Sequence, residues 1–180
     1  MERRCTGSAW WNSLGDRGQS GILEKEVMPT SDEQIQFLVT LQRLLDEGQF
    51  VASYKFALLL SFADLCVEMG NDSGSALTLT TDAIGDKFIQ YYWRQAIPYP
   101  TASKASVLKQ NTGKQAAVVN LIGTTREKHG DSIATIMKRT EVWKKLREEV
   151  SRVVRIMPLW KLQTVGGTPA VLVQHPDNQT

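Results

Sequence analysis

The sequence predicts an all-α protein, a helical bundle of about five helices with irregular N- and C-terminal extensions. Over several long segments, apolar residues recur at three- and four-residue spacing, which is the period of one face of an α-helix. Glycine, proline and capping residues separate these segments. The chain has 180 residues, of which 42% are hydrophobic and 22% charged, so it is long enough to bury one core.

The first two helices are expected on either side of Gly48. Ser31 with Gln34 three residues later forms a capping box, which begins a helix, and the apolar residues of this helix share one face. The next helix, about residues 53–69, is apolar almost all round. Such a helix is typical of the centre of a bundle.

Three further helices follow, each bounded by its own signals. Thr81 or Asp82 caps the first of them, and Pro98 follows its end. The polar and basic residues 101–111 indicate a connecting loop or a short helix. The last helix ends at Pro158, which lacks a backbone N–H. The three helices are expected from residue 81 or 82 to 97, from about 114 to 128 and from about 140 to 157.

The expected domain organisation is one helical domain with two flanking segments. Residues 1–27 are rich in glycine, serine and charge and read as a poorly ordered extension. The helical domain spans residues 28–165, and residues 166–180 form a divergent tail. No run approaches the roughly 18 apolar residues of a membrane span, and no apolar segment of a signal peptide is present. Two unpatterned cysteines suit a reducing compartment, so we expect a cytoplasmic protein that does not enter a membrane.

Four separated segments carry a family resemblance over roughly residues 34–167. They read LQRLLDEGQFVASYKFALLLSFAD (41–64), KFIQYYWRQAIPY (87–99), LKQNTGKQAAVVN (108–120) and IMPLWKLQTVGG (156–167). In this order they resemble the helical N-terminal region of a family of bacterial HNH endonuclease-type proteins. The resemblance implies a non-catalytic helical module that, in an intact relative, holds or positions DNA for the nuclease finger.

The residues of HNH chemistry are missing from this chain. That chemistry needs several His, Asn, Asp and Cys residues in one short segment around a divalent metal, often in a finger braced by zinc. The chain has only Cys5, Cys66, His129 and His175, and none lies at ligand spacing from another. We therefore expect no catalytic residue, no metal ligand and no cofactor in this chain. The divalent metal and zinc belong to the absent nuclease portion.

The two ends of the chain depart from the family pattern. The tail from Thr168 to Thr180 does not continue into a further helical region, which suggests a truncated or frameshifted gene product or an experimental fragment. The resemblance begins only after Met28, which suggests the hypothesis that Met28 is the authentic start.

The two halves of the chain differ in charge. Residues 1–99 have a net charge of −5 and residues 100–165 a net charge of +8. Asp177 in the remaining segment brings the total to +2. Positions 144, 147 or 148, 151 or 152, and 155 fall roughly on one face of the last helix. One interpretation is a phosphate-binding surface for DNA. The other is a solvated helix face whose cations pair with Glu148 and Glu149. The candidate nucleic-acid-binding residues are Lys104, Lys109, Lys114, Lys138, Arg139, Lys144, Lys145, Arg152 and Arg155.

Two alternatives to DNA binding stay open. Apolar helix faces exposed by the loss of the C-terminal half would self-associate or bind a protein partner, such as the missing nuclease region. A cryptic enzyme is the third class, although no convergent acid, base or nucleophile set supports it. Near the middle of the chain, Trp93 and Arg94 are the candidates for base stacking, while helical spacing favours a core role for the aromatic residues beside them.

Overall fold

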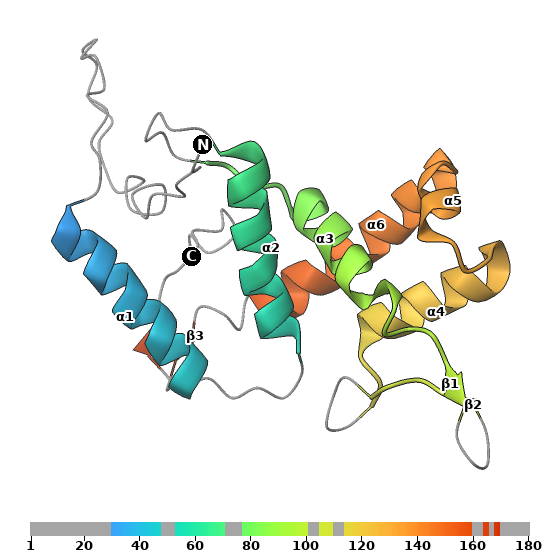
Figure 1. Cartoon of the computed structure of the whole chain (residues 1–180), viewed down its shortest axis with the longest axis horizontal. Coiled ribbons are helices and arrows are strands. Elements are labelled where there is room, and N and C mark those ends of the chain that lie inside the picture. The colour runs from blue at the N-terminus through green and yellow to red at the C-terminus, as the bar shows by residue number, and fades with distance from the viewer. Residues whose placement is uncertain are drawn as a thin grey trace, which may run out of the picture. The chain divides into compact units, whose positions relative to one another are not determined.

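A computed structural model describes residues 30–47, 53–70, 77–100, 105–109, 114–159, 164–165 and 168–169, and it confirms an all-α protein (Figure 1). In these ranges the helices are α1 (Ser31–Glu47), α2 (Tyr54–Met69), α3 (Thr81–Trp93), α4 (Ala117–His129), α5 (Ile133–Met137), α6 (Thr140–Val154) and the π-helix η2 (Arg155–Leu159). Two antiparallel pairs of two-residue strands join β1 (Tyr99–Pro100) to β2 (Ala105–Ser106) and β3 (Thr164–Val165) to β4 (Thr168–Pro169). None of the described helices is long and apolar enough to cross a membrane.

The described residues fall into two compact units, and the continuous helix α2 contributes residues to both. One unit contains α1, the part of α2 from Ala63 onward, and the β3–β4 pair. In this unit α1 contacts β3. The other unit contains α2 up to Phe62, the β1–β2 pair, and the helices from α3 to η2. The predicted basic surface belongs to this second unit.

The core of the second unit forms where α3, α4 and α6 meet. Phe88 of α3, Ile122 of α4 and Val150 of α6 are fully buried, and α6 contacts both other helices. Apolar residues recur along α6 at three- and four-residue spacing, and this stripe is the buried one. Burial of such a stripe supplies most of the stability of an amphipathic helix. The opposite side of α6 is therefore left to solvent.

Helices α3 and α6 approach most closely at Gly85. A Cβ atom built on Gly85 would lie 2.4 Å from the Ser151 Oγ atom and 3.5 Å from the backbone oxygen of Arg147. The Ser151 hydroxyl donates a hydrogen bond to the backbone oxygen of Thr81, at 3.3 Å. A side chain at position 85 would therefore displace the Ser151 hydroxyl where the two helices cross. This close contact sets which side of α6 is exposed.

Helix α1 begins at Ser31, where the capping box predicted a helix start, whereas the cap of α3 lies one residue before the two predicted positions. The residue that caps α3 is Thr80, not Thr81 or Asp82, because Thr80 has an extended backbone and its hydroxyl accepts from the N–H of Ala83 at 3.1 Å. At α1, the N–H of Gln34 donates to the backbone oxygen of Thr30 at 3.1 Å. Threonine before the first turn serves as an N-cap as serine does, so the sequence contained adjacent candidates of similar quality.

Helix α4 begins at Ala117, three residues later than predicted. The N–H of Val118 donates to the Tyr54 hydroxyl at 2.9 Å, and the N–H of Ala116 donates to the side-chain oxygen of Gln115 at 3.0 Å. These bonds satisfy donors that the start of a helix leaves without partners. Tyr54 comes from α2, so local sequence could not show this cap. Lys114 accordingly precedes the helix.

Three further segments differ from the sequence predictions. Of residues 101–111, which were expected to form a loop or a short helix, the structure describes 105–109, and Ala105–Ser106 form β2. Its partner β1 contains Pro100, consistent with the extended backbone that proline imposes on the residue before it. Helix α5 was not predicted, because it has only five residues. Ser132 caps it and its Ile136 is fully buried. The last helix does not stop at Pro158, which lies inside the wider π-turn η2. A wider turn relieves the clash between the proline ring and the preceding turn.

The predicted extension of residues 1–27 lies outside the described residues. The same holds for the predicted tail, apart from Thr168 and Pro169.

Candidate nucleic-acid interface

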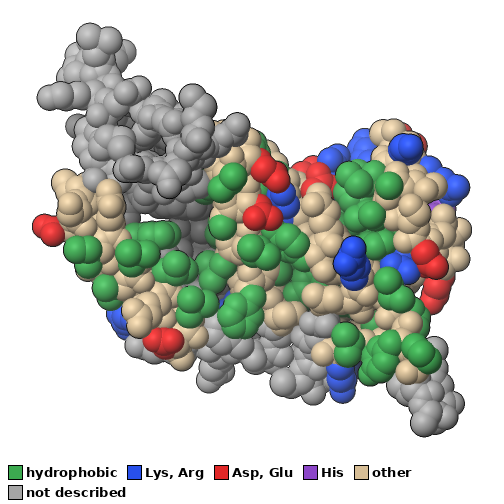
Figure 2. Space-filling view, viewed as in Figure 1, with side chains coloured by type: hydrophobic (Ala, Val, Ile, Leu, Met, Phe, Trp, Pro, Cys, Tyr) green, Lys and Arg blue, Asp and Glu red, His purple; other side chains and the backbone are tan. Residues whose placement is uncertain are grey.

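Eight of the nine predicted nucleic-acid-binding residues are described, and all eight side chains are exposed. Lys104 lies outside the described residues. Two side chains precede α4, two lie at the junction of α5 and α6, and four lie on α6 and η2. Figure 2 shows Lys and Arg side chains gathered around α5. The residues are, in the same order, Lys109, Lys114, Lys138, Arg139, Lys144, Lys145, Arg152 and Arg155.

The exposed cations of α6 lie on one side of the helix. At about 100° per residue, Lys144, Arg155, Arg152 and Lys145 fall within about 100° of its circumference, and all four side chains are exposed. Lys145 and Arg152 line a groove shared with α4, whereas Lys144 and Arg155 lie on the flank beside the groove. Of positions 147 and 148, which the sequence left open for this face, Arg147 instead contacts α3.

A groove with a volume of about 600 Å³ lies between α4 and α6. Its surface is mostly apolar, with cationic and small polar side chains around it. Both helices contribute to it: Ala117, Asn120, Leu121, Thr124, Thr125 and Lys128 from α4, and Val142, Lys145, Leu146, Glu149, Arg152 and Val153 from α6. The groove therefore brings together three cations and one carboxylate from segments that are distant in sequence.

The three cations of this groove are available to a ligand. Within the described part of the chain, Lys128, Lys145 and Arg152 form no ion pair and no side-chain hydrogen bond. The single carboxylate of the groove, Glu149, forms none there either. Three positive charges against one negative charge make the groove attractive to anions.

Arg147 differs from these cations because it is engaged with α3. Its Nη1 atom lies 3.4 Å from the Asp86 Oδ2 atom, and its Nε atom lies 3.8 Å from the Asp82 Oδ2 atom. Burial raises the pKa of the Asp86 carboxyl above its ordinary value, and the nearby Arg147 guanidinium lowers this pKa in part. Arg147 thus fastens α6 to α3, and its side chain is only partly exposed.

Arg126 is also removed from the surface. Its Nη1 atom donates to the backbone oxygen of Trp93 at 3.1 Å, and its Nη2 atom donates to the Asp131 carboxylate at 2.7 Å. The guanidinium lies 5.3 Å from the centre of the Trp93 ring, and the indole N–H donates to the backbone oxygen of Asp131 at 2.9 Å. These contacts among Trp93, Arg126 and Asp131 join the end of α3 to the end of α4. Trp93 is buried there, so the prediction of Trp93 as a base-stacking candidate is wrong.

Lys128 belongs to the groove but was missed by sequence reasoning. It lies three residues after Thr125 and seven after Leu121, which is the spacing of one helix face, and both of these residues also line the groove. The pattern was therefore visible in the predicted helix of residues 114–128. What the sequence could not show is that this face of α4 meets α6.

Among the residues that the structure describes, no group of three or more His, Cys, Asp or Glu side chains could hold a metal ion. Comparison with protein-family models, with curated proteins and with solved structures finds no match for this chain. The resemblance to HNH endonuclease-type proteins therefore stays a prediction. The geometry of the groove is the basis for the function proposed below.

Proposed function

We propose that this protein binds nucleic acid, namely DNA, without catalysing a reaction on it, through the groove between α4 and α6. The observation that supports this proposal is the convergence of Lys128, Lys145 and Arg152 on one groove without ion-pair partners in the described chain. Exposed cations that converge from two helices match the regular negative charge of a phosphate backbone.

The groove suits a phosphate backbone better than it suits base recognition. Lysine and arginine gain affinity for DNA because they release condensed counterions, and this gain does not depend on base sequence. Asn120 and Thr124 add polar groups that can bond phosphate or sugar oxygens. No aromatic side chain lines the groove, so stacking on bases is not part of the proposal. We expect similar affinity for different duplex sequences.

The biological role follows from the family resemblance as a further proposal. The helical module would hold DNA in the cytoplasm for a nuclease finger. The residues at the α5–α6 junction, Lys138 and Arg139, would extend the cationic surface beyond the groove.

The test measures the fluorescence anisotropy of a labelled duplex against the full chain at two salt concentrations. Three phosphate contacts predict a slope of about −2.7 for log affinity against log salt, so the affinity should fall roughly 40-fold between about 50 mM and about 200 mM salt. Replacement of Lys145 and Arg152 by glutamine should reduce this slope by about 1.8.

The matched control replaces Lys144 and Arg155 by glutamine, because this variant loses the same charge from the flank beside the groove. The groove proposal requires that the control binds DNA much better than the Lys145/Arg152 variant. An equal loss of affinity in both variants would show that only overall charge matters. Absence of binding at about 50 mM salt would refute nucleic-acid binding itself.

A further inference from the structure

The α4–α6 groove has an apolar floor that DNA binding does not require. Contacts to phosphate use only the cations and polar groups around the groove. Water nevertheless reaches much of the floor: Ala117 is exposed, and Leu121, Val142 and Val153 are half-buried. An apolar surface that is open to water beside charged groups is typical of a site for another chain. The apolar residues of the floor are Ala117, Leu121, Val142, Leu146 and Val153.

Two helical seams of identical spacing border this floor. Helix α4 contributes positions 117, 121, 124 and 128, and α6 contributes positions 142, 146, 149 and 153. The intervals are four, three and four residues in both helices, so each set falls within about 60° of its helix circumference and spans about 16 Å, or about three turns. Two such seams side by side offer a groove in which the apolar seam of a third helix can pack.

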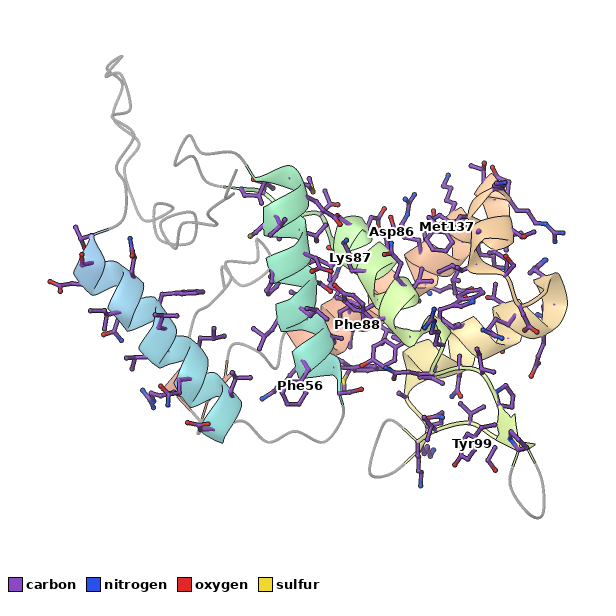
Figure 3. All side chains as sticks on the ribbon, viewed as in Figure 1. Phe56, Asp86, Lys87, Phe88, Tyr99 and Met137 are labelled. Carbon is purple, nitrogen blue, oxygen red and sulfur yellow. The ribbon has the colours of Figure 1, made fainter. Side chains whose placement is uncertain are left out.

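The groove side of α6 is distinct from the side that holds the fold together. Val150 and Val154 are fully buried on the core side. Figure 3 shows Phe88 of α3 among the crowded side chains of this core. Val142 and Val153 lie on the groove side and keep part of their surface exposed. The groove seam is therefore a second face of a helix that is already packed.

The charges around the groove select an acidic partner. Lys128, Lys145 and Arg152 line it together with a single carboxylate, that of Glu149. A helix whose apolar residues enter the floor would bring its flanking residues level with these cations, as e and g positions do in a coiled coil. Carboxylates at the flanks would pair with the cations, whereas lysine or arginine there would be repelled.

We propose that the α4–α6 groove binds an acidic amphipathic helix of about three turns from a partner protein. The apolar seam of that helix packs on the floor, and its flanking carboxylates meet Lys128, Lys145 and Arg152. This inference goes beyond DNA binding and does not rest on it, because the apolar floor is its basis. The helix and DNA would compete for the groove, since Lys145 and Arg152 serve both ligands.

The test measures the fluorescence anisotropy of a labelled probe peptide of about 18 residues, with leucine at a and d, glutamate at e and g, and alanine or glutamine elsewhere. The full chain is titrated to about 500 µM, which detects even a Kd of about 1 mM. One control peptide has the same composition with its leucines scrambled, and the other has lysine in place of glutamate. The probe should bind at least about 10-fold more tightly than either control.

Variants of the chain place the peptide in the groove. Ala117→Glu puts a carboxylate on the floor at the first residue of α4, where negative charge favours the helix, so the fold is kept while binding falls roughly 5-fold or more. Replacement of Lys145 and Arg152 by glutamine should also weaken binding roughly 5-fold. The matched control, with Lys144 and Arg155 replaced by glutamine, should change it by less than about 2-fold. Circular dichroism checks that the helices of all variants form.

Three results would overturn the inference. They are absence of probe binding, equal affinity for the probe and the scrambled peptide, and full binding by Ala117→Glu. Where a DNA duplex also binds, the unlabelled probe should displace it, and simultaneous binding of both would place the peptide outside the groove. The two proposals fail separately: a chain that binds the probe but no duplex refutes DNA binding alone, and a chain that binds the duplex but no probe refutes this inference alone.

Discussion

Substitution of Gly85 by alanine tests the close approach of α3 and α6 that determines the exposed face of α6. In an isolated helix this change would stabilise by about 1 kcal/mol, because alanine has the higher helix propensity. In this protein the new Cβ atom would lie 2.4 Å from the Ser151 Oγ atom. Overpacking of this kind costs about 1–3 kcal/mol, and displacement of the serine hydroxyl from the backbone oxygen of Thr81 costs about 1 kcal/mol more. We expect Gly85→Ala to lower the free energy of unfolding by about 1–3 kcal/mol.

Removal of the serine hydroxyl should reverse the sign of this effect. Without the Oγ atom, the nearest neighbours of the new Cβ are the Arg147 backbone oxygen and the Ser151 Cβ atom, both at 3.5 Å, which is an ordinary contact distance. In a Ser151→Ala background, Gly85→Ala should therefore stabilise by about 1 kcal/mol. The coupling energy between the two positions is then about 2–4 kcal/mol.

Urea denaturation followed by circular dichroism measures the four members of this double-mutant cycle. All four chains should unfold with similar dependence on denaturant, so that differences in midpoint report stability. If Gly85→Ala stabilises the wild-type chain and its effect is additive with that of Ser151→Ala, the two helices do not cross as closely as described. The assignment of Lys145 and Arg152 to the groove side of α6 would then be wrong as well.

Two further predictions concern the side chains that hold α6 and α4 in place. Arg126→Met should lower the free energy of unfolding by about 2–4 kcal/mol in urea titrations, since it removes two charged hydrogen bonds and the cation–π contact with Trp93. The control Lys128→Met, on the exposed side of α4, should change this free energy by less than about 0.5 kcal/mol. Equal effects of the two substitutions would contradict the role of Arg126 in joining α3 to α4. Burial raises the pKa of Asp86, so the fold disfavours the ionised carboxylate. The contribution of the protonated carboxyl to stability is therefore largest below the ordinary pKa of 3.8. This contribution is lost as pH rises through 3.8 toward the raised pKa. In thermal melts, the stability of the wild-type chain relative to Asp86→Asn should therefore decrease as pH rises from about 3 to about 6. An increase would show that the charge of Arg147 outweighs the burial of the carboxyl.

Several features of the fold could be predicted because they depend on neighbours in the sequence. The helix that contains Trp143 and Val150 repeats its apolar residues at helical spacing over four turns, and it forms where expected. The glycine after the helix of residues 114–128 also marks its end: Gly130 has a φ of 101°, and its N–H donates to the backbone oxygen of Arg126 at 2.8 Å. Such positive φ angles are favourable almost only for glycine.

The candidate site was predicted only in part, because it depends on contacts between distant segments. Composition located the cations in the C-terminal half, and Lys145 and Arg152 do line the groove. Lys128 was missed because its role appears only when α4 packs beside α6. The sequence left open whether position 147 or 148 belongs to the cationic face. Arg147 does not, because it pairs with a carboxylate of α3 more than 60 residues away.

The sequence by itself determined the all-α class, the approximate extent of the long helices and the excess of positive charge in the C-terminal half, since periodicity, capping and composition act over a few residues. The tertiary structure decided which stripe of each helix is buried, which arginines form ion pairs within the fold, and which cations line one groove. These choices arise when helices far apart in the chain bury their apolar stripes against each other, and a close crossing such as that of Gly85 and Ser151 then determines what remains exposed.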